Sequence, residues 1–160
     1  MDKPFQRKGS LSNTHVGKEF EITAQAFFQK NNLILERNIK IDLGVEQIKK
    51  THAFDLGSLE QKIIVECKSN TWTSGNKVPS AKLTVWNEAM YYFLIAPDDF
   101  RKIMFVLHDF CERRSESLAQ YYLRRYYHLI PSNVEFWEYN PATSEALELK
   151  KSNKVFDFTG

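Results

Sequence analysis

Three charged residues, Asp55, Glu66 and Lys68, have the types and spacing that best suit chemistry in this chain. Glu66 and Lys68 end an apolar run at residues 63–65 (Ile-Ile-Val), which is typical of a buried strand. Side chains two positions apart on a strand point to the same face, so Glu66 and Lys68 project together. Charged groups seldom lie at the end of a core strand without a partner or a function, because removing them from water is costly.

The spacing of Glu66 and Lys68 is not informative by itself. An acidic residue followed two positions later by lysine occurs three times, at Glu60/Lys62, Glu66/Lys68 and Glu148/Lys150. That is close to the number expected by chance for this composition. Context separates the three, because the first pair lies at a predicted turn and the last in a tail of mixed pattern, whereas the middle pair follows a core strand.

A predicted hairpin brings Asp55 to Glu66. Residues 52–58 and 62–68 both have strand patterns, and the turn is centred on residues 60–61. Positions 55 and 66 are equally far from that centre, so they pair, with Cβ atoms roughly 4.5–5.5 Å apart. Two carboxylates this close need a divalent cation, or one of them stays protonated. Their hard oxygen atoms favour Mg²⁺ or Mn²⁺ over zinc. The alternative is a surface hairpin on which Glu66 and Lys68 form an ordinary ion pair.

The other predicted elements surround this hairpin. A helix begins at Thr14 and carries an apolar stripe, Val16, Phe20, Ala24 and Phe27. Further patterns predict strands at residues 33–41, 103–107 and 134–139, a helix at 81–95 capped by Ser80, and a third helix, to about residue 126, that Ser115 can cap. We therefore expect an α/β fold, a three-layer α/β/α domain with a central mixed sheet over residues 14–160, preceded by a flexible arm at 1–13. The pattern of residues 147–160 is unclear.

Composition excludes several protein classes. The chain has 160 residues and a net charge of +2, which neither requires nor excludes nucleic acid as a partner. No apolar run approaches the roughly 20 residues that span a bilayer, and the first residues lack the apolar core of a secretory signal, so we expect no membrane partner. Two cysteines, Cys67 and Cys111, are too few for a disulfide scaffold, which favours a reducing, cytoplasmic location.

Asp55, ten intervening residues and then Glu66-Cys67-Lys68 on an apolar strand resemble the PD-(D/E)XK nuclease superfamily, which has the restriction-endonuclease-like fold. Residues 17–21 (Gly-Lys-Glu-Phe-Glu) resemble the first-helix pattern of that superfamily. The resemblance spans about residues 17–95 and the strand at 103–107. Phe54 stands where the superfamily often has proline, a position at which its members vary.

The resemblance implies a role for each of these residues. Asp55 and Glu66 would bind a divalent metal, Mg²⁺ with Mn²⁺ as a substitute, together with the backbone carbonyl of Cys67. Lys68 would position or activate the attacking water, and Glu21 would support a second metal or a metal-bound water. Spacing alone leaves Glu19 as a competing choice on the other flank of the helix.

The implied activity is Mg²⁺-dependent hydrolysis of DNA, by an endonuclease of the restriction or repair type. The resemblance also allows a homodimer. One alternative is a catalytically inactive nuclease-fold module used in DNA binding or assembly. Another is an unrelated protein-interaction domain whose acidic pair is incidental.

Four basic residues are candidates for nucleic-acid binding: Lys77, Lys82, Arg124 and Arg125. Lys77 in a polar loop, Lys82 at the start of the following helix and arginines beside tyrosines can contact a phosphate backbone. For Lys82 the alternative is a solvated lysine in the first turn of the helix. For the others the alternative is a mobile loop and the charged face of an amphipathic helix. His52 is three residues before Asp55 on the same strand, so it is expected to face the opposite side and to pack in the core or at an edge. Cys67 alternates away from Glu66 and Lys68, which favours a buried structural thiol.

Overall fold

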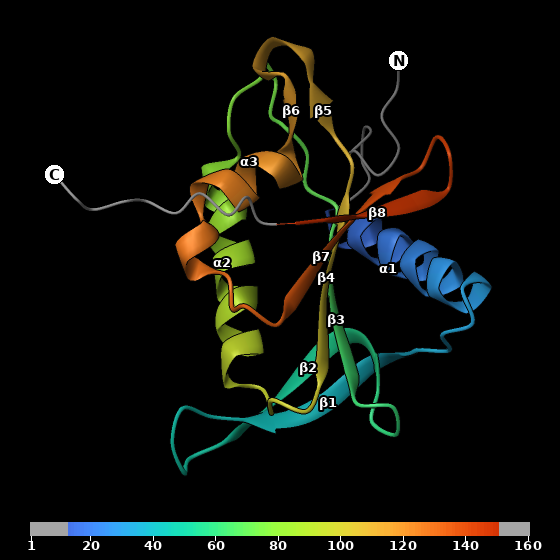
Figure 1. The fold of residues 1–160 in the computed structure, drawn as a ribbon, viewed down its shortest axis with the longest axis vertical. Helices are drawn as coiled ribbons and strands as arrows, with labels where there is room; N and C mark the ends of the chain where they lie inside the picture. Colours follow the sequence, from blue (N-terminus) through green and yellow to red (C-terminus); the bar gives the residue numbers. More distant parts are fainter. Residues whose placement is uncertain (1–12, 151–160) are drawn as a thin grey trace, which may run out of the picture.

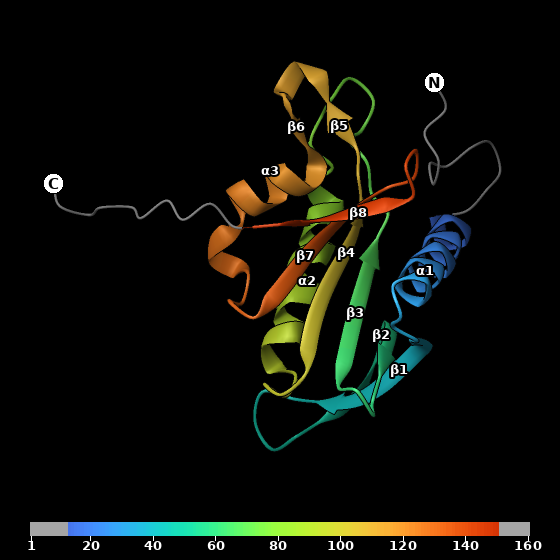
Figure 2. The same cartoon turned by 45° about the vertical axis from the view of Figure 1, so that its right-hand side comes forward.

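The computed structural model describes residues 13–150, which form a mixed sheet with helices on both faces (Figures 1 and 2). The helices are α1 (Asn13–Lys30), α2 (Ser80–Ile95) and α3 (Leu118–Arg125), with short 3₁₀ turns at Glu112–Arg114 and Tyr127–Leu129. The strands are β1 (Glu36–Leu43), β2 (Lys50–Ser58), β3 (Ile63–Lys68), β4 (Arg101–Leu107), β5 (Phe110–Cys111), β6 (Glu116–Ser117), β7 (Val134–Asn140) and β8 (Glu145–Leu149). The predicted arm lies outside the described residues, except for Asn13, which begins α1. Among residues 13–150, no helix is long and apolar enough to cross a membrane.

The main sheet has six strands in the order β1-β2-β3-β4-β7-β8. The three central strands, β3, β4 and β7, are parallel, and the outer strands run antiparallel to their neighbours. The β2–β3 hairpin has the predicted register, with Leu56 opposite Val65 and Ser58 opposite Ile63. Because the central strands are parallel, their carboxyl ends lie at the same end of the sheet, and Glu66 and Lys68 are at that end. The expected α/β class with a mixed sheet is confirmed.

Each face of the sheet has its own hydrophobic core. On one face, α2 and α3 cover the sheet through Trp86, Phe93 and Tyr122, which are fully buried. On the other face, Phe20 and Phe28 of α1 pack around Phe105 of β4, with ring centroids 5.7 and 5.1 Å away. From Lys102 to its end, β4 is buried on both sides, as its continuous apolar run predicts.

Both predicted serine caps are wrong. Pro79 is the N-cap of α2 and makes no side-chain capping bond, while Ser80 is already helical. The third helix is capped by Ser117, because Ser115 has a positive φ of 53° that closes the preceding 3₁₀ turn. The small β5–β6 hairpin occupies the residues where the sequence pattern starts the helix. The first three residues of the tail with unclear pattern, 147–149, belong to strand β8, and residues 151–160 lie outside the described part.

Replacing Ser117 by alanine is expected to lower the free energy of unfolding by about 2 kcal/mol. Ser117 is fully buried, its Oγ accepts a hydrogen bond from the Gln120 N–H, and it donates another to the buried Glu138 carboxylate. The variant therefore loses a helix cap and leaves a buried acceptor short of a donor. Urea unfolding measures the change, with the exposed Ser132→Ala as a control that should stay within about 0.5 kcal/mol of wild type. Equal effects of both substitutions would contradict this account.

Candidate active site

The geometry of the site is set by a change of face in β2. Phe54 packs in the core beneath α2, whereas Leu56 packs in the core beneath α1. Residues two apart on a regular strand share a face, so the strand twists sharply at Asp55 between them. The neighbouring strand β1 is irregular at the same level, because Asn38 has a positive φ of 54° and its pairing with β2 skips position 55.

Asp55 leaves the β2–β3 ladder at this twist. The ladder ends at the pair Leu56–Val65, so the predicted direct pairing of Asp55 with Glu66 is not part of it. The carboxylate of Asp55 instead accepts a hydrogen bond from the backbone N–H of Cys67, at 2.8 Å. Asp55 is therefore held against the strand that carries Glu66 and Lys68, between the two strands.

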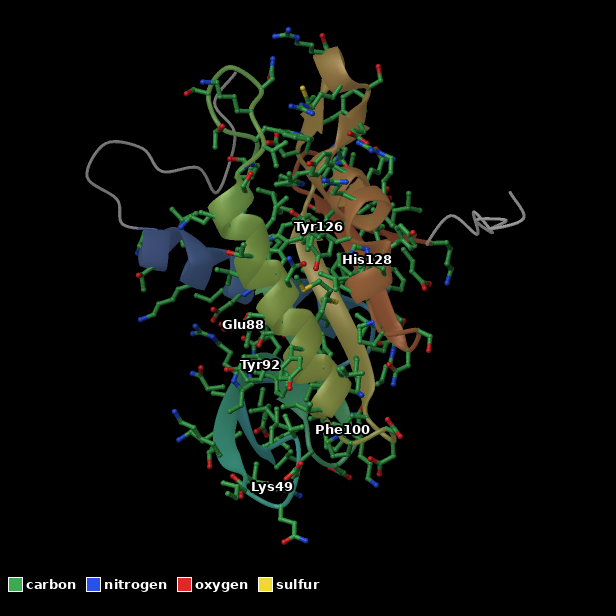
Figure 3. All side chains as sticks on the ribbon, turned by 90° about the vertical axis from the view of Figure 1, so that its left-hand side faces the viewer. Lys49, Glu88, Tyr92, Phe100, Tyr126 and His128 are labelled. Carbon is green, nitrogen blue, oxygen red and sulfur yellow. The ribbon has the colours of Figure 1, made fainter. Side chains whose placement is uncertain are left out.

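Glu66 is 6% exposed and lies between two nitrogen groups. The Lys68 Nζ atom is 3.4 Å from Glu66 Oε2, and the His52 Nε2 atom is 3.5 Å from Glu66 Oε1. The imidazole of His52 also stacks on the ring of Tyr92 in α2, with centroids 3.8 Å apart; Figure 3 shows Tyr92 on the side of α2 that approaches β1 and β2.

The prediction that His52 packs in the core or at its edge agrees with its contacts to Tyr92 and Phe54, but the expectation that it faces away from the acidic residues is wrong, because it lies beside Glu66. That expectation assumed regular alternation from His52 to Asp55, but the strand changes face just before Leu56. His52 therefore stays with Phe54 on the α2 side, where Glu66 also projects. Cys67, in contrast, packs on the α1 side, as alternation predicts.

The first helix brings a third carboxylate to the site. Glu21 is 20% exposed and accepts a hydrogen bond from the Arg37 guanidinium at 3.1 Å. Its charge contributes to the raised pKa of Asp55. Glu19, the competing choice, is 52% exposed and pairs with His15 instead. The structure therefore places Glu21, and not Glu19, beside Asp55.

Burial and neighbouring charges raise the pKa of Asp55 to about 7. Burial contributes most, followed by the negative charges of Glu66 and Glu21, while the Cys67 N–H and the Lys68 ammonium oppose the shift. Burial and the same three carboxylates also raise the pKa of the Cys67 thiol, which argues against a nucleophilic cysteine. The site thus has a local excess of negative charge that a cation would compensate.

The donor set fits Mg²⁺ better than a transition metal. Among residues 13–150, no group of three or more His, Cys, Asp or Glu side chains is placed to hold a metal ion. Asp55 and Glu66 offer two carboxylates, with the backbone carbonyl of Cys67 between Glu66 and Lys68. Mg²⁺ is commonly bound by one or two carboxylates and keeps several waters, so this smaller set suits it.

Comparison with other proteins gives no further guide to this site. No protein-family model, curated protein or solved structure matches the chain. The function must therefore be argued from the geometry.

The four predicted nucleic-acid contacts are all exposed and none bonds to Asp55, Glu66 or Lys68 within the described range. Lys77 lies in the loop after β3, and Lys82 is in the first turn of α2. Arg124 is engaged by Glu116, with nitrogen–oxygen distances of 3.2 and 2.8 Å, whereas Arg125 is exposed beside it at the end of α3.

Sequence reasoning missed a buried anchor next to the site. Asp109, which is 4% exposed, accepts a hydrogen bond from the Trp72 N–H at 2.8 Å, and its backbone carbonyl accepts one from the Trp72 indole at 2.9 Å. These bonds fix the loop after β3 to the residues that follow β4. The available signal was a tryptophan in an otherwise polar loop and an aspartate just beyond an apolar strand.

Proposed function

We propose that this chain is a Mg²⁺-dependent nuclease that hydrolyses DNA phosphodiester bonds, with a restriction-endonuclease-like fold. One observation carries the proposal. The twist of β2 holds Asp55 against β3, next to Glu66 and Lys68, in a half-buried site. The charge of Glu21 on α1 also acts on Asp55 there. A partly buried carboxyl group with a raised pKa, such as Asp55, next to a second carboxylate and a lysine is typical of functional sites rather than of solvated hairpins.

The element order supports the fold assignment. The resemblance to the PD-(D/E)XK superfamily covers a helix, three strands, a second helix and a further strand. The chain has this order as α1, β1 to β3, α2 and β4, with β4 parallel to β3. The motif residues lie on β2 and β3, and Glu21 lies on α1.

Each side chain has a distinct chemical task in this proposal. Asp55 and Glu66 would hold the metal, which supplies a Lewis acid for the phosphate and lowers the pKa of a bound water. Glu66 forms an ion pair with Lys68 and lies beside the His52 imidazole. The Lys68 ammonium would orient the attacking water and stabilise negative charge that develops on the phosphate. Glu21, held by Arg37, would accept a hydrogen bond from a water in the same place.

A cleavage assay on duplex, branched and single-stranded DNA tests the proposal. We expect cleavage with Mg²⁺ or Mn²⁺, none in EDTA, and none with the Asp55→Asn variant. The matched control is Asp42→Asn, which removes one carboxylate from the exposed part of β1 and should cut like wild type. Cleavage that persists in EDTA or in Asp55→Asn would refute the assignment. Metal binding by wild type without cleavage of any substrate would instead identify an inactive module.

A further inference from the structure

The loops that follow β3 and β4 form a projection that we call the Trp72 lobe. It consists of residues 69–79, which begin directly after Lys68, and residues 108–117, which begin directly after β4. Figures 1 and 2 show the two segments extending together beyond the carboxyl ends of these strands. A polymer bound across the carboxyl ends of the strands, where Glu66 and Lys68 lie, would therefore also contact this lobe.

The Trp72 lobe is held together by specific contacts. Trp72 is 5% exposed and makes the two hydrogen bonds to Asp109 described above. The Arg114 guanidinium lies over the Trp72 ring, 4.9 Å from its centroid, and its Nε donates to the Asn76 carbonyl at 3.0 Å. A backbone bridge joins Thr73 to Lys77. Because the lobe is already ordered, a partner would lose little affinity to the ordering of these loops.

The Trp72 lobe itself has three basic and three acidic residues, and an excess of cations arises when the first turn of α2 and helix α3 beside it are included. Residues 69–82 and 108–125 contain six basic residues: Lys77, Lys82, Arg113, Arg114, Arg124 and Arg125. The same stretches contain three acidic residues, of which Asp109 is buried against Trp72 and Glu116 pairs with Arg124. Lys77 and Arg113 are exposed, and neither side chain forms an ion pair within residues 13–150. Only Glu112 remains as an exposed acid in these stretches.

We propose that the Trp72 lobe, together with the first turn of α2 and helix α3 beside it, binds the phosphodiester backbone of DNA beside the cleavage site. The inference rests on the proposed nuclease function and adds the surface that holds the substrate. The site itself is rich in carboxylates and repels DNA, so neighbouring cations must supply the attraction. The rings of Trp72 and Tyr121 lie beneath Arg114 and Arg124, at 4.9 and 5.3 Å, so the arginines cover them. Because the rings are covered, they cannot stack on bases, whereas the exposed cations can contact phosphates.

The test is the salt dependence of DNA binding by the full chain. Affinity for a short labelled duplex is measured by fluorescence anisotropy in EDTA, where no cleavage is expected. The test variant is Lys77→Ala combined with Arg113→Ala. The matched control is Lys49→Ala combined with Lys50→Ala, which removes the same charge from the opposite end of the strands; Figure 3 shows Lys49 there.

We expect the lobe variant to bind about tenfold more weakly, and its slope of log affinity against log salt to fall by about 1.8, as two lost phosphate contacts predict. The control should stay within about twofold of wild type. Equal weakening of both variants, unchanged binding by the lobe variant, or no DNA binding by wild type would overturn the inference. Wild type that binds through the lobe but never cleaves would overturn the nuclease proposal and leave this one standing.

Discussion

Replacement of Lys68 by alanine is expected to lower the rate of Mg²⁺-dependent DNA cleavage by at least about 100-fold. The Lys68 ammonium is 18% exposed and 3.4 Å from Glu66, and its charge opposes the raised pKa of Asp55. In the proposed mechanism, its removal would take away the cation that faces the phosphate. The initial rate of cleavage at saturating Mg²⁺ measures the effect, and circular dichroism verifies that the variant is folded.

The chain itself provides a matched control for this substitution. Lys62 stands in the same glutamate-x-lysine spacing, but it is 53% exposed and pairs with Asp99 on the surface. We expect Lys62→Ala to cut within about twofold of wild type, because exposed ion pairs contribute little. If Lys68→Ala cleaves DNA at the wild-type rate, or if Lys62→Ala loses as much of the cleavage rate as Lys68→Ala, then Lys68 has no specific role in the mechanism.

Replacement of Asp55 by asparagine is expected to stabilise the metal-free protein at pH 8 by about 2–4 kcal/mol. The folded pKa of Asp55, about 7, is above its ordinary value of 3.8. Its stabilising contribution is therefore complete below pH 3.8 and is lost as the pH rises through 7. Asparagine has no charge to bury and keeps an oxygen that can accept from the Cys67 N–H.

Urea unfolding in EDTA at pH 4 and pH 8 measures this effect. The gain in stability from Asp55→Asn should be several times larger at pH 8 than at pH 4. Added Mg²⁺ should stabilise wild type more than the variant, because a ligand stabilises the state that binds it. A variant that is less stable than wild type at pH 8 would show that Asp55 is already compensated without a cation.

The sequence was sufficient for the register of the β2–β3 hairpin but not for the placement of Asp55, which lies outside the ladder. The register of β2 and β3 follows from a turn centred on residues 60–61 and an apolar strand that must face the core, so it was predictable. The choice between Glu19 and Glu21 was not, because helical spacing places both beside the buried stripe. Only the packing of α1 against the sheet decides it, by bringing Glu21 to Arg37 on β1.

The remaining errors come from interactions that local patterns do not contain. His52 was assigned to the wrong face because the strand twists at Asp55, where Phe54 packs in one core and Leu56 in the other. Ser115 was mistaken for a cap because a tiny hairpin and a positive φ precede α3. Trp72 and Asp109 are 37 positions apart, so their bonds could be seen only after β3 and β4 were placed side by side.

Phe54 and Leu56 lie in separate cores, so the orientation of Asp55 between them depends on the packing of both cores. A larger side chain in one layer and a smaller one in the other would rotate the strand about its own axis and tilt the carboxylate, with no change to any charged group. Buried apolar side chains would then change the position of a carboxylate that is proposed to bind a divalent ion. If the site binds a metal as proposed, its affinity would therefore depend on side-chain volume in the two cores as well as on charge.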